Sequence, residues 1–104
     1  FEELYTDLQI KIDEVAERIL TLGGAPFHTF SSFTEHSTVH PDANIADGRS
    51  AVTSILDSLK IIIEIQRNLL ILSGDAQDEG TNALMSDYIR AQEKLVWMYS
   101  AYLG

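Results

Sequence analysis

The fold is decided by residues 1–26, which read FEELYTDLQIKIDEVAERILTLGGAP. Apolar residues recur there at steps of three and four, the spacing of one face of an α-helix. They are Phe1, Leu4, Tyr5, Leu8, Ile12, Val15, Ala16, Ile19 and Leu22. Gly23 and Gly24 are a glycine signal for a helix end, and Pro26 keeps the helix from resuming. We therefore predict an amphipathic helix from the first residue to about residue 22.

A second long helix is predicted for residues 47–72. Its apolar stripe consists of Val52, Ile55, Leu56, Leu59, Ile62, Ile63 and Leu70. The run at residues 60–65, KIIIEI, is apolar on nearly every side, so this helix is expected to be buried on more than one face. Gly74 is expected to close it.

A third long helix is predicted to start after a cap at residues 75–78 and to reach Gly104. Its apolar residues are Leu84, Met85, Tyr88, Leu95, Met98, Tyr99 and Tyr102. Residues 25–46 read as loop, in which the spacing of Phe27, Phe30 and Phe33 allows one short helix. Few, long helices predict an all-α bundle, and 104 residues predict a single domain.

The composition of the chain excludes or disfavours several classes of function and of binding site. The formal net charge is −9, which disfavours direct binding of DNA or of an anionic membrane. The chain has no cysteine, so disulfides, thiolate metal sites and cysteine nucleophiles are excluded. Neither a leader peptide nor a stretch of eighteen apolar residues occurs, and we expect a cytoplasmic protein.

The first helix carries two carboxylates in an unusual place. Asp13 and Glu17 are one turn apart, no Lys or Arg lies three or four residues from either, and Ile10 and Leu20 flank them. Two like charges on a face that is to be buried are costly unless a cation or a donor lies between them. The alternative is a solvated acidic pair, as on the face that holds the acid-to-base pairs Asp7–Lys11 and Glu14–Arg18. If a metal binds, carboxylate oxygens suit a hard cation, and added imidazole favours iron or zinc.

Residues 12–26, IDEVAERILTLGGAP, resemble the second-helix signature of the Dps miniferritins, in which an Asp and a Glu four apart precede an R-I-x-x-L-G-G-x-P ending. The runs DEGT at 78–81 and QEKLVWM at 92–98 are similar to the start and middle of the last Dps helix. The resemblance implies a ferritin-like four-helix bundle with a short crossover helix. It also implies assembly into a hollow dodecamer that oxidises ferrous iron and stores it as ferric mineral, which protects against oxidative damage.

The resemblance also implies roles for single residues. The family's ferroxidase site lies between two-fold-related subunits, and its Asp and Glu fall on Asp13 and Glu17. Three further acidic residues fall near the junction where the family places the lining of pores through which iron enters: Asp75, Asp78 and Glu79. Their alternative role is to cap the third helix. Trp97 matches a family tryptophan and is expected in the core.

The resemblance begins after the first of the family's four bundle helices, so we expect a fragment without that helix. In the family that helix carries the ferroxidase histidines. His28, His36 and His40 lie instead in the insert and are expected to be solvent-facing loop residues.

Two functions stay open: an iron-storing miniferritin, and a non-catalytic Dps remnant that oligomerises without a complete ferroxidase site. With only the carboxylates present, ferroxidase activity of these 104 residues is expected to be weak or absent unless a histidine-bearing helix is supplied. The groove left by that helix is expected to cause association with other copies.

Overall fold

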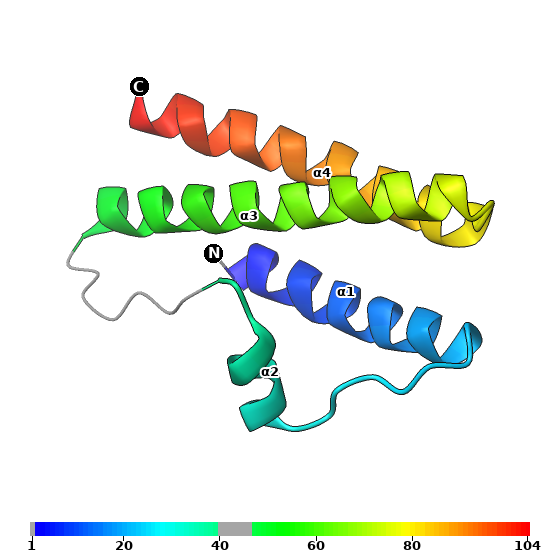
Figure 1. The fold of residues 1–104 in the computed structure, drawn as a ribbon. Helices are drawn as coiled ribbons and strands as arrows, with labels where there is room; N and C mark the ends of the chain where they lie inside the picture. Colours follow the sequence, from blue (N-terminus) through cyan, green and yellow to red (C-terminus); the bar gives the residue numbers. More distant parts are fainter. Residues whose placement is uncertain (1, 40–46) are drawn as a thin grey trace. The chain divides into compact units, whose positions relative to one another are not determined.

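The structure, a computed structural model, describes residues 2–39 and 47–104. Within these ranges every regular element is a helix (Figure 1): α1 (Glu2–Thr21), α2 (Phe30–His36), α3 (Gly48–Asp75) and α4 (Glu79–Leu103). The prediction of an all-α chain with three long helices and one short one is confirmed. None of the helices in these ranges has the length and apolar character that crossing a membrane requires. The chain divides into two compact units, Phe1–Ser37 and Thr38–Gly104.

The end of α1 is the glycine-dependent stop that the sequence predicts. The Gly24 N–H donates to the carbonyl of Ile19 at 2.9 Å, and the Gly23 N–H donates to that of Leu20 at 3.0 Å. Gly23 has a φ of 87°, a conformation that is costly for any residue with a Cβ. A Cβ at Gly24 would approach the Ile19 side chain to 2.9 Å. Both glycines are therefore required by the geometry of a Schellman-type end.

The short helix α2 starts at a hydroxyl cap. The Thr29 side chain accepts a hydrogen bond from the Ser32 N–H at 3.2 Å. Phe27 precedes the helix and stacks on the His36 ring, with 4.4 Å between ring centroids. The predicted short helix is confirmed for Phe30 and Phe33, and Phe27 lies outside it.

The helix α3 ends later than predicted. Its start at the Asp47 cap is as expected, because the Asp47 carboxylate accepts from the Ser50 N–H at 2.7 Å. Gly74 does not close it, since the helix continues to Asp75 and Gln77 takes the left-handed conformation with a φ of 58°. The Asn82 amide donates to the Leu70 carbonyl at 2.9 Å and would lie 3.5 Å from a Cβ at Gly74. That distance is an ordinary van der Waals contact, so neither the helix end nor the approach of Asn82 requires a glycine at position 74.

The helices α3 and α4 lie side by side as a hairpin (Figure 1). The buried apolar side chains of the described residues all belong to these two helices: Val52, Leu56, Leu59, Ile63, Met85 and Tyr88. Four of them come from the predicted stripe of α3 and two from that of α4. The core of this unit is therefore formed along the α3–α4 seam.

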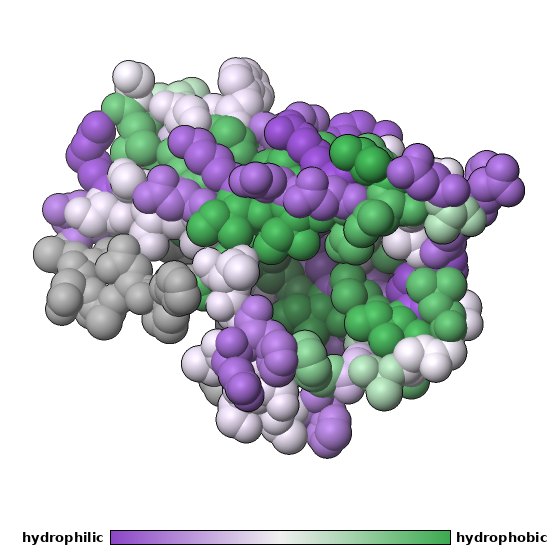
Figure 2. Space-filling view, in the orientation of Figure 1, coloured by the Kyte–Doolittle hydropathy of each residue, from purple (hydrophilic) through white to green (hydrophobic). Residues whose placement is uncertain are grey.

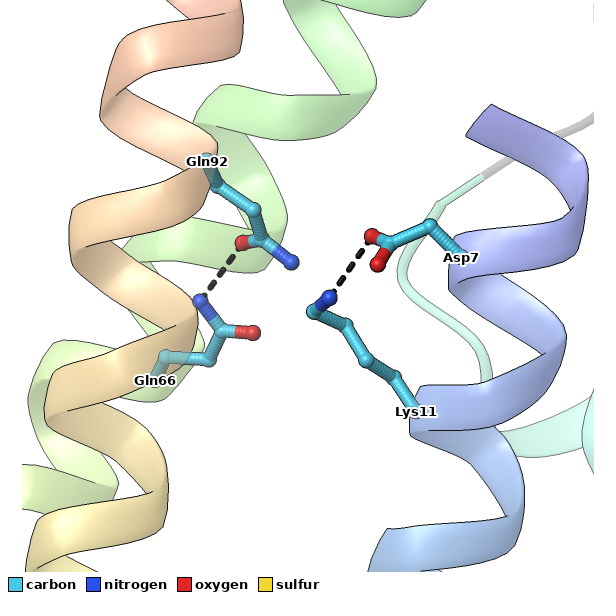
Figure 3. A network of polar contacts seen from close by, with 4 residues as sticks. All are labelled: Asp7, Lys11, Gln66 and Gln92. Carbon is cyan, nitrogen blue, oxygen red and sulfur yellow. Dashed lines mark hydrogen bonds and ion pairs between the residues drawn. The ribbon is translucent and has the colours of Figure 1, made fainter. Parts of the chain in front are cut away.

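A buried pair of amides crosses the seam. The Gln66 side chain donates to the carbonyl oxygen of Gln92 at 2.7 Å, and the two residues are 7 % and 1 % exposed (Figure 3). The sequence pattern did not predict either residue as buried. Because a buried amide is costly without a partner, this bond favours one register of α3 against α4.

Much of the remaining apolar surface of the hairpin is open. Figure 2 shows apolar surface along part of α3 in that view. Of the isoleucine run, Ile63 is buried, whereas Ile61 and Ile65 are 36 % and 44 % exposed. Trp97 is 68 % exposed, so the prediction that it packs in the core is wrong for this hairpin. Its position in α4 turns the indole away from the seam that Tyr88 and Gln92 fill.

Candidate metal centre

The candidate carboxylates belong to α1, a helix in which none of the described side chains is buried. Asp13 and Glu17 are both exposed, and no described residue of α1 is buried. Ile10 and Leu20, which flank the two carboxylates, are 54 % and 60 % exposed. The expected burial of this face is therefore not supplied by the residues that the structure describes, and it stays a prediction about an assembled form.

The two carboxylates also have no partner in the described part of the chain. Neither Asp13 nor Glu17 takes part in an ion pair or a side-chain hydrogen bond there. On another face of α1, Lys11 Nζ lies 2.6 Å from Asp7 Oδ2, as the four-residue spacing predicts (Figure 3). One helix thus holds a neutralised carboxylate at Asp7 and two that remain available to a cation.

A complete coordination sphere is not present. Within residues 2–39 and 47–104, no group of three or more His, Asp or Glu side chains is placed to hold a metal ion. Iron and other divalent metals take four to six ligands in proteins, so a site at Asp13 and Glu17 needs ligands from elsewhere. Two adjacent carboxylates nevertheless fit a metal that prefers oxygen, since they supply both charge and donor atoms.

The three acidic residues at the α3–α4 turn lie at different points relative to the two helix ends. Asp75 is the last residue of α3 and Glu79 is the first of α4. Asp78 caps α4, because its carboxylate accepts from the Thr81 N–H at 3.2 Å and from the Thr81 hydroxyl at 2.5 Å. The capping role is confirmed for Asp78, and a role of the three residues in a pore stays a prediction.

The histidines do not join the carboxylates in the described chain. His28 and His36 are exposed, and Nδ1 of His36 lies 2.9 Å from the Ser32 carbonyl within its own short helix. His40 lies outside the described residues.

Comparisons with known proteins identify the family. The sequence model of the ferritin-like domain matches residues 1–104. A Dps protein of Vibrio cholerae, described as a member of a broad superfamily of ferritin-like diiron-carboxylate proteins, is 52 % identical and superposes with a TM-score of 0.97 over 99 % of this chain. The DNA protection during starvation protein of Porphyromonas gingivalis is 43 % identical over 98 % of the chain. DNA protection during starvation protein 2 of Bacillus anthracis is 35 % identical over the whole chain and 71 % of its own length.

The chain therefore belongs to the ferritin-like family and, within it, to the Dps proteins. It spans 65 % of the Vibrio cholerae chain and 64 % of the Porphyromonas gingivalis protein, just under two thirds of each.

Proposed function

We propose that this chain is part of a Dps-type iron-sequestering assembly, in which Asp13 and Glu17 supply the carboxylate half of a di-iron ferroxidase site. The observation that carries the proposal is the carboxylate pair itself. The two carboxylates lie one turn apart on α1, are exposed, and have no protein partner in the described residues. The chain that carries them is 52 % identical to a protein described as a member of the ferritin-like diiron-carboxylate superfamily.

Iron is the substrate and the cargo in this proposal. Asp13 and Glu17 bind ferrous ions through oxygen and reduce the electrostatic cost of the higher charge that each ion gains when it gives an electron to dioxygen. Imidazole ligands from another copy or from residues beyond these 104 complete the coordination. Other parts of the proposal are a single ferritin-like domain over residues 1–104, homo-oligomeric assembly, a cytoplasmic location, and a cation path at Asp75, Asp78 and Glu79.

A second candidate is a Dps-type module that assembles without oxidising iron. The observation in its favour is that the described residues offer no third ligand to the carboxylate pair. The net charge of −9 argues against direct DNA binding in either case.

The test is oxidation of ferrous iron by the 104-residue chain and by the same chain supplied with its preceding segment, should one exist in the parent gene. We expect slow oxidation by the former and faster oxidation by the latter, abolished by Asp13→Asn or Glu17→Gln. Glu3→Gln is the matched control, because it removes one charge from α1 on the face that carries Asp7.

Two results would decide against the ferroxidase proposal. If Asp13→Asn and Glu17→Gln leave the rate of iron oxidation unchanged, the reaction takes place at another site. An assembled protein that neither binds nor oxidises ferrous iron would favour the non-catalytic module.

A further inference from the structure

One of the two candidate carboxylates belongs to the last turn of α1. Glu17 lies four residues before Thr21, which is the last residue of the helix, and Asp13 lies one turn further from the end. Helix ends open more readily than helix interiors, because the last carbonyls have no partner within the helix. No described side chain of α1 is buried, so burial contributes little to holding this turn. The backbone at Glu17 therefore depends on the hydrogen bonds of the helix end.

Four consecutive carbonyls at this end each accept a hydrogen bond. The Glu17 carbonyl accepts from the Thr21 hydroxyl at 2.8 Å. The carbonyls of residues 18–20 accept from the N–H groups of residues 22–24, at 2.9–3.0 Å. Groups that are usually left unpaired at a helix end are thus paired here by residues that follow Glu17 directly in the chain.

The two glycines are what permits this closed end. Gly23 has a φ of 87°, and a Cβ there would meet no other atom within 4 Å, so the cost of a side chain would be in the backbone conformation alone. A Cβ at Gly24 would lie 2.9 Å from Cγ2 of Ile19 and 3.3 Å from its carbonyl oxygen. A side chain at either position therefore disfavours the chain path that brings these N–H groups to the last carbonyls.

The closed end has a consequence for metal binding. On an intact helix, residues four apart place their Cβ atoms about 5–6 Å from each other, so two carboxylates can act on the same ion or ion pair. When the last turn opens, Glu17 leaves this register while Asp13, one turn further in, keeps its place. The apparent affinity of the pair for a metal then falls in proportion to the fraction of molecules in which the turn is closed.

We propose that Thr21, Gly23 and Gly24 form a positioning element that holds Glu17 in register with Asp13. The inference rests on the proposed function, in which the two carboxylates bind iron, and it adds the residues that keep the pair ready for the metal. The three residues act through the backbone of α1 and do not themselves bind the ion. This preorganisation raises affinity without any further contact to the ligand.

The first test is amide hydrogen exchange without metal. Gly23→Ala should speed exchange at the amides of residues 22–24 on the order of fivefold, because a left-handed conformation is costly for alanine. The matched control is Gly104→Ala, since Gly104 follows α4 with a φ of 94° and a Cβ there also meets nothing within 4 Å. It should leave exchange at residues 22–24 unchanged. Exchange at these amides that is the same in Gly23→Ala and wild type would overturn the proposal.

The second test is the binding of ferrous iron by the assembled protein without oxygen, measured by titration calorimetry. Gly23→Ala should lower the affinity on the order of fivefold, in step with the faster exchange. Thr21→Val, which loses the hydroxyl, should lower it on the order of twofold, and Thr21→Ser should restore it. Gly104→Ala should bind as the wild type does. Circular dichroism checks that each variant keeps its helices.

The outcomes separate this inference from the proposed function. Wild-type affinity in Gly23→Ala, together with loss of binding in Asp13→Asn, would overturn the positioning role and leave the iron site intact. An equal loss of affinity in Gly23→Ala and Gly104→Ala would also overturn it, because the effect would then be one of general stability. Equal affinity in wild type, Gly23→Ala and Asp13→Asn would overturn both the positioning role and the proposed site.

Discussion

The helix α1 and the α3–α4 hairpin have equally regular apolar stripes, but the stripes differ in how far their side chains are buried. The hairpin contributes every buried side chain of the described residues, including Leu59 at 2 % exposure, and α1 contributes none. Along α1 the stripe positions Ile12 and Val15 are 53 % and 38 % exposed. A stripe of helical period thus predicts the helix and its face, but it does not say that the same chain covers that face.

The largest expected difference between these regions is in the cost of removing an apolar side chain. Leu59→Ala should lower the free energy of unfolding by about 2–5 kcal/mol, because it removes a fully buried side chain and leaves a cavity. Ile12→Ala, in α1, should cost less than about 1 kcal/mol at concentrations where the chain is unassociated. Urea unfolding of both variants measures this. Equal losses would mean that α1 is packed as tightly as the hairpin.

The next effect concerns the amides that set the register of the hairpin. Gln92→Leu should destabilise by about 1–3 kcal/mol, since the buried Gln66 amide loses its partner. The double variant Gln66→Leu with Gln92→Leu should cost less than the sum of the single variants, because both polar groups are then gone. A double-mutant cycle from denaturant unfolding gives the coupling. Strict additivity would show that the 2.7 Å bond contributes nothing to stability.

A smaller effect, of opposite sign, is expected at the turn between α3 and α4. Gln77 holds a φ of 58°, which a residue with a Cβ adopts at a cost, so Gln77→Gly should stabilise by about 0.5–1 kcal/mol. Ala76→Gly is the matched control, because Ala76 is right-handed with a φ of −82° and should not gain. Thermal unfolding compares the two, and a loss of stability in Gln77→Gly would contradict the left-handed assignment.

The smallest effect is the pH dependence of the cap on α3. The hydrogen bond from the Ser50 N–H lowers the pKa of Asp47 below its usual value of 3.8. A lowered folded-state pKa means that the cap's contribution is complete above the unfolded pKa and is lost as pH falls through the lowered value. Asp47→Asn keeps an acceptor and should show a weaker loss of helicity between about pH 5 and pH 2. Identical acid titrations by circular dichroism would exclude a contribution from this carboxylate.

The sequence was sufficient to predict the approximate ranges of the helices and the position of Asp13 and Glu17 on a face of α1 separate from that of Asp7. Spacing gave the stripes, Gly23 and Gly24 gave the end of α1, and the helical wheel separated Asp13 and Glu17 from Asp7 and its partner. Each of these is a local property, determined by residues within a few positions of one another.

The features that the sequence did not predict depend on contacts between distant residues. Gln66 and Gln92 are 26 positions apart, and nothing in the pattern of either helix marks a polar residue as buried. Trp97 is apolar, which predicts the core, yet the seam is already filled by smaller and more central residues. Gly74 suggested a helix end, but α3 continues to Asp75 and the left-handed residue at the turn is Gln77. The further ligands that the proposed metal site at Asp13 and Glu17 requires would likewise come from distant residues or another copy, which a local pattern does not predict.

The most direct test of the central claim, that Asp13 and Glu17 bind iron, is a crystal structure of the assembled protein soaked with ferrous iron without oxygen. Anomalous scattering at the iron edge locates the metal. We expect iron density between the two carboxylates, with further ligands from another copy or from additional residues of the polypeptide. Iron density found only elsewhere, with both carboxylates bare in a fully assembled shell, would contradict it.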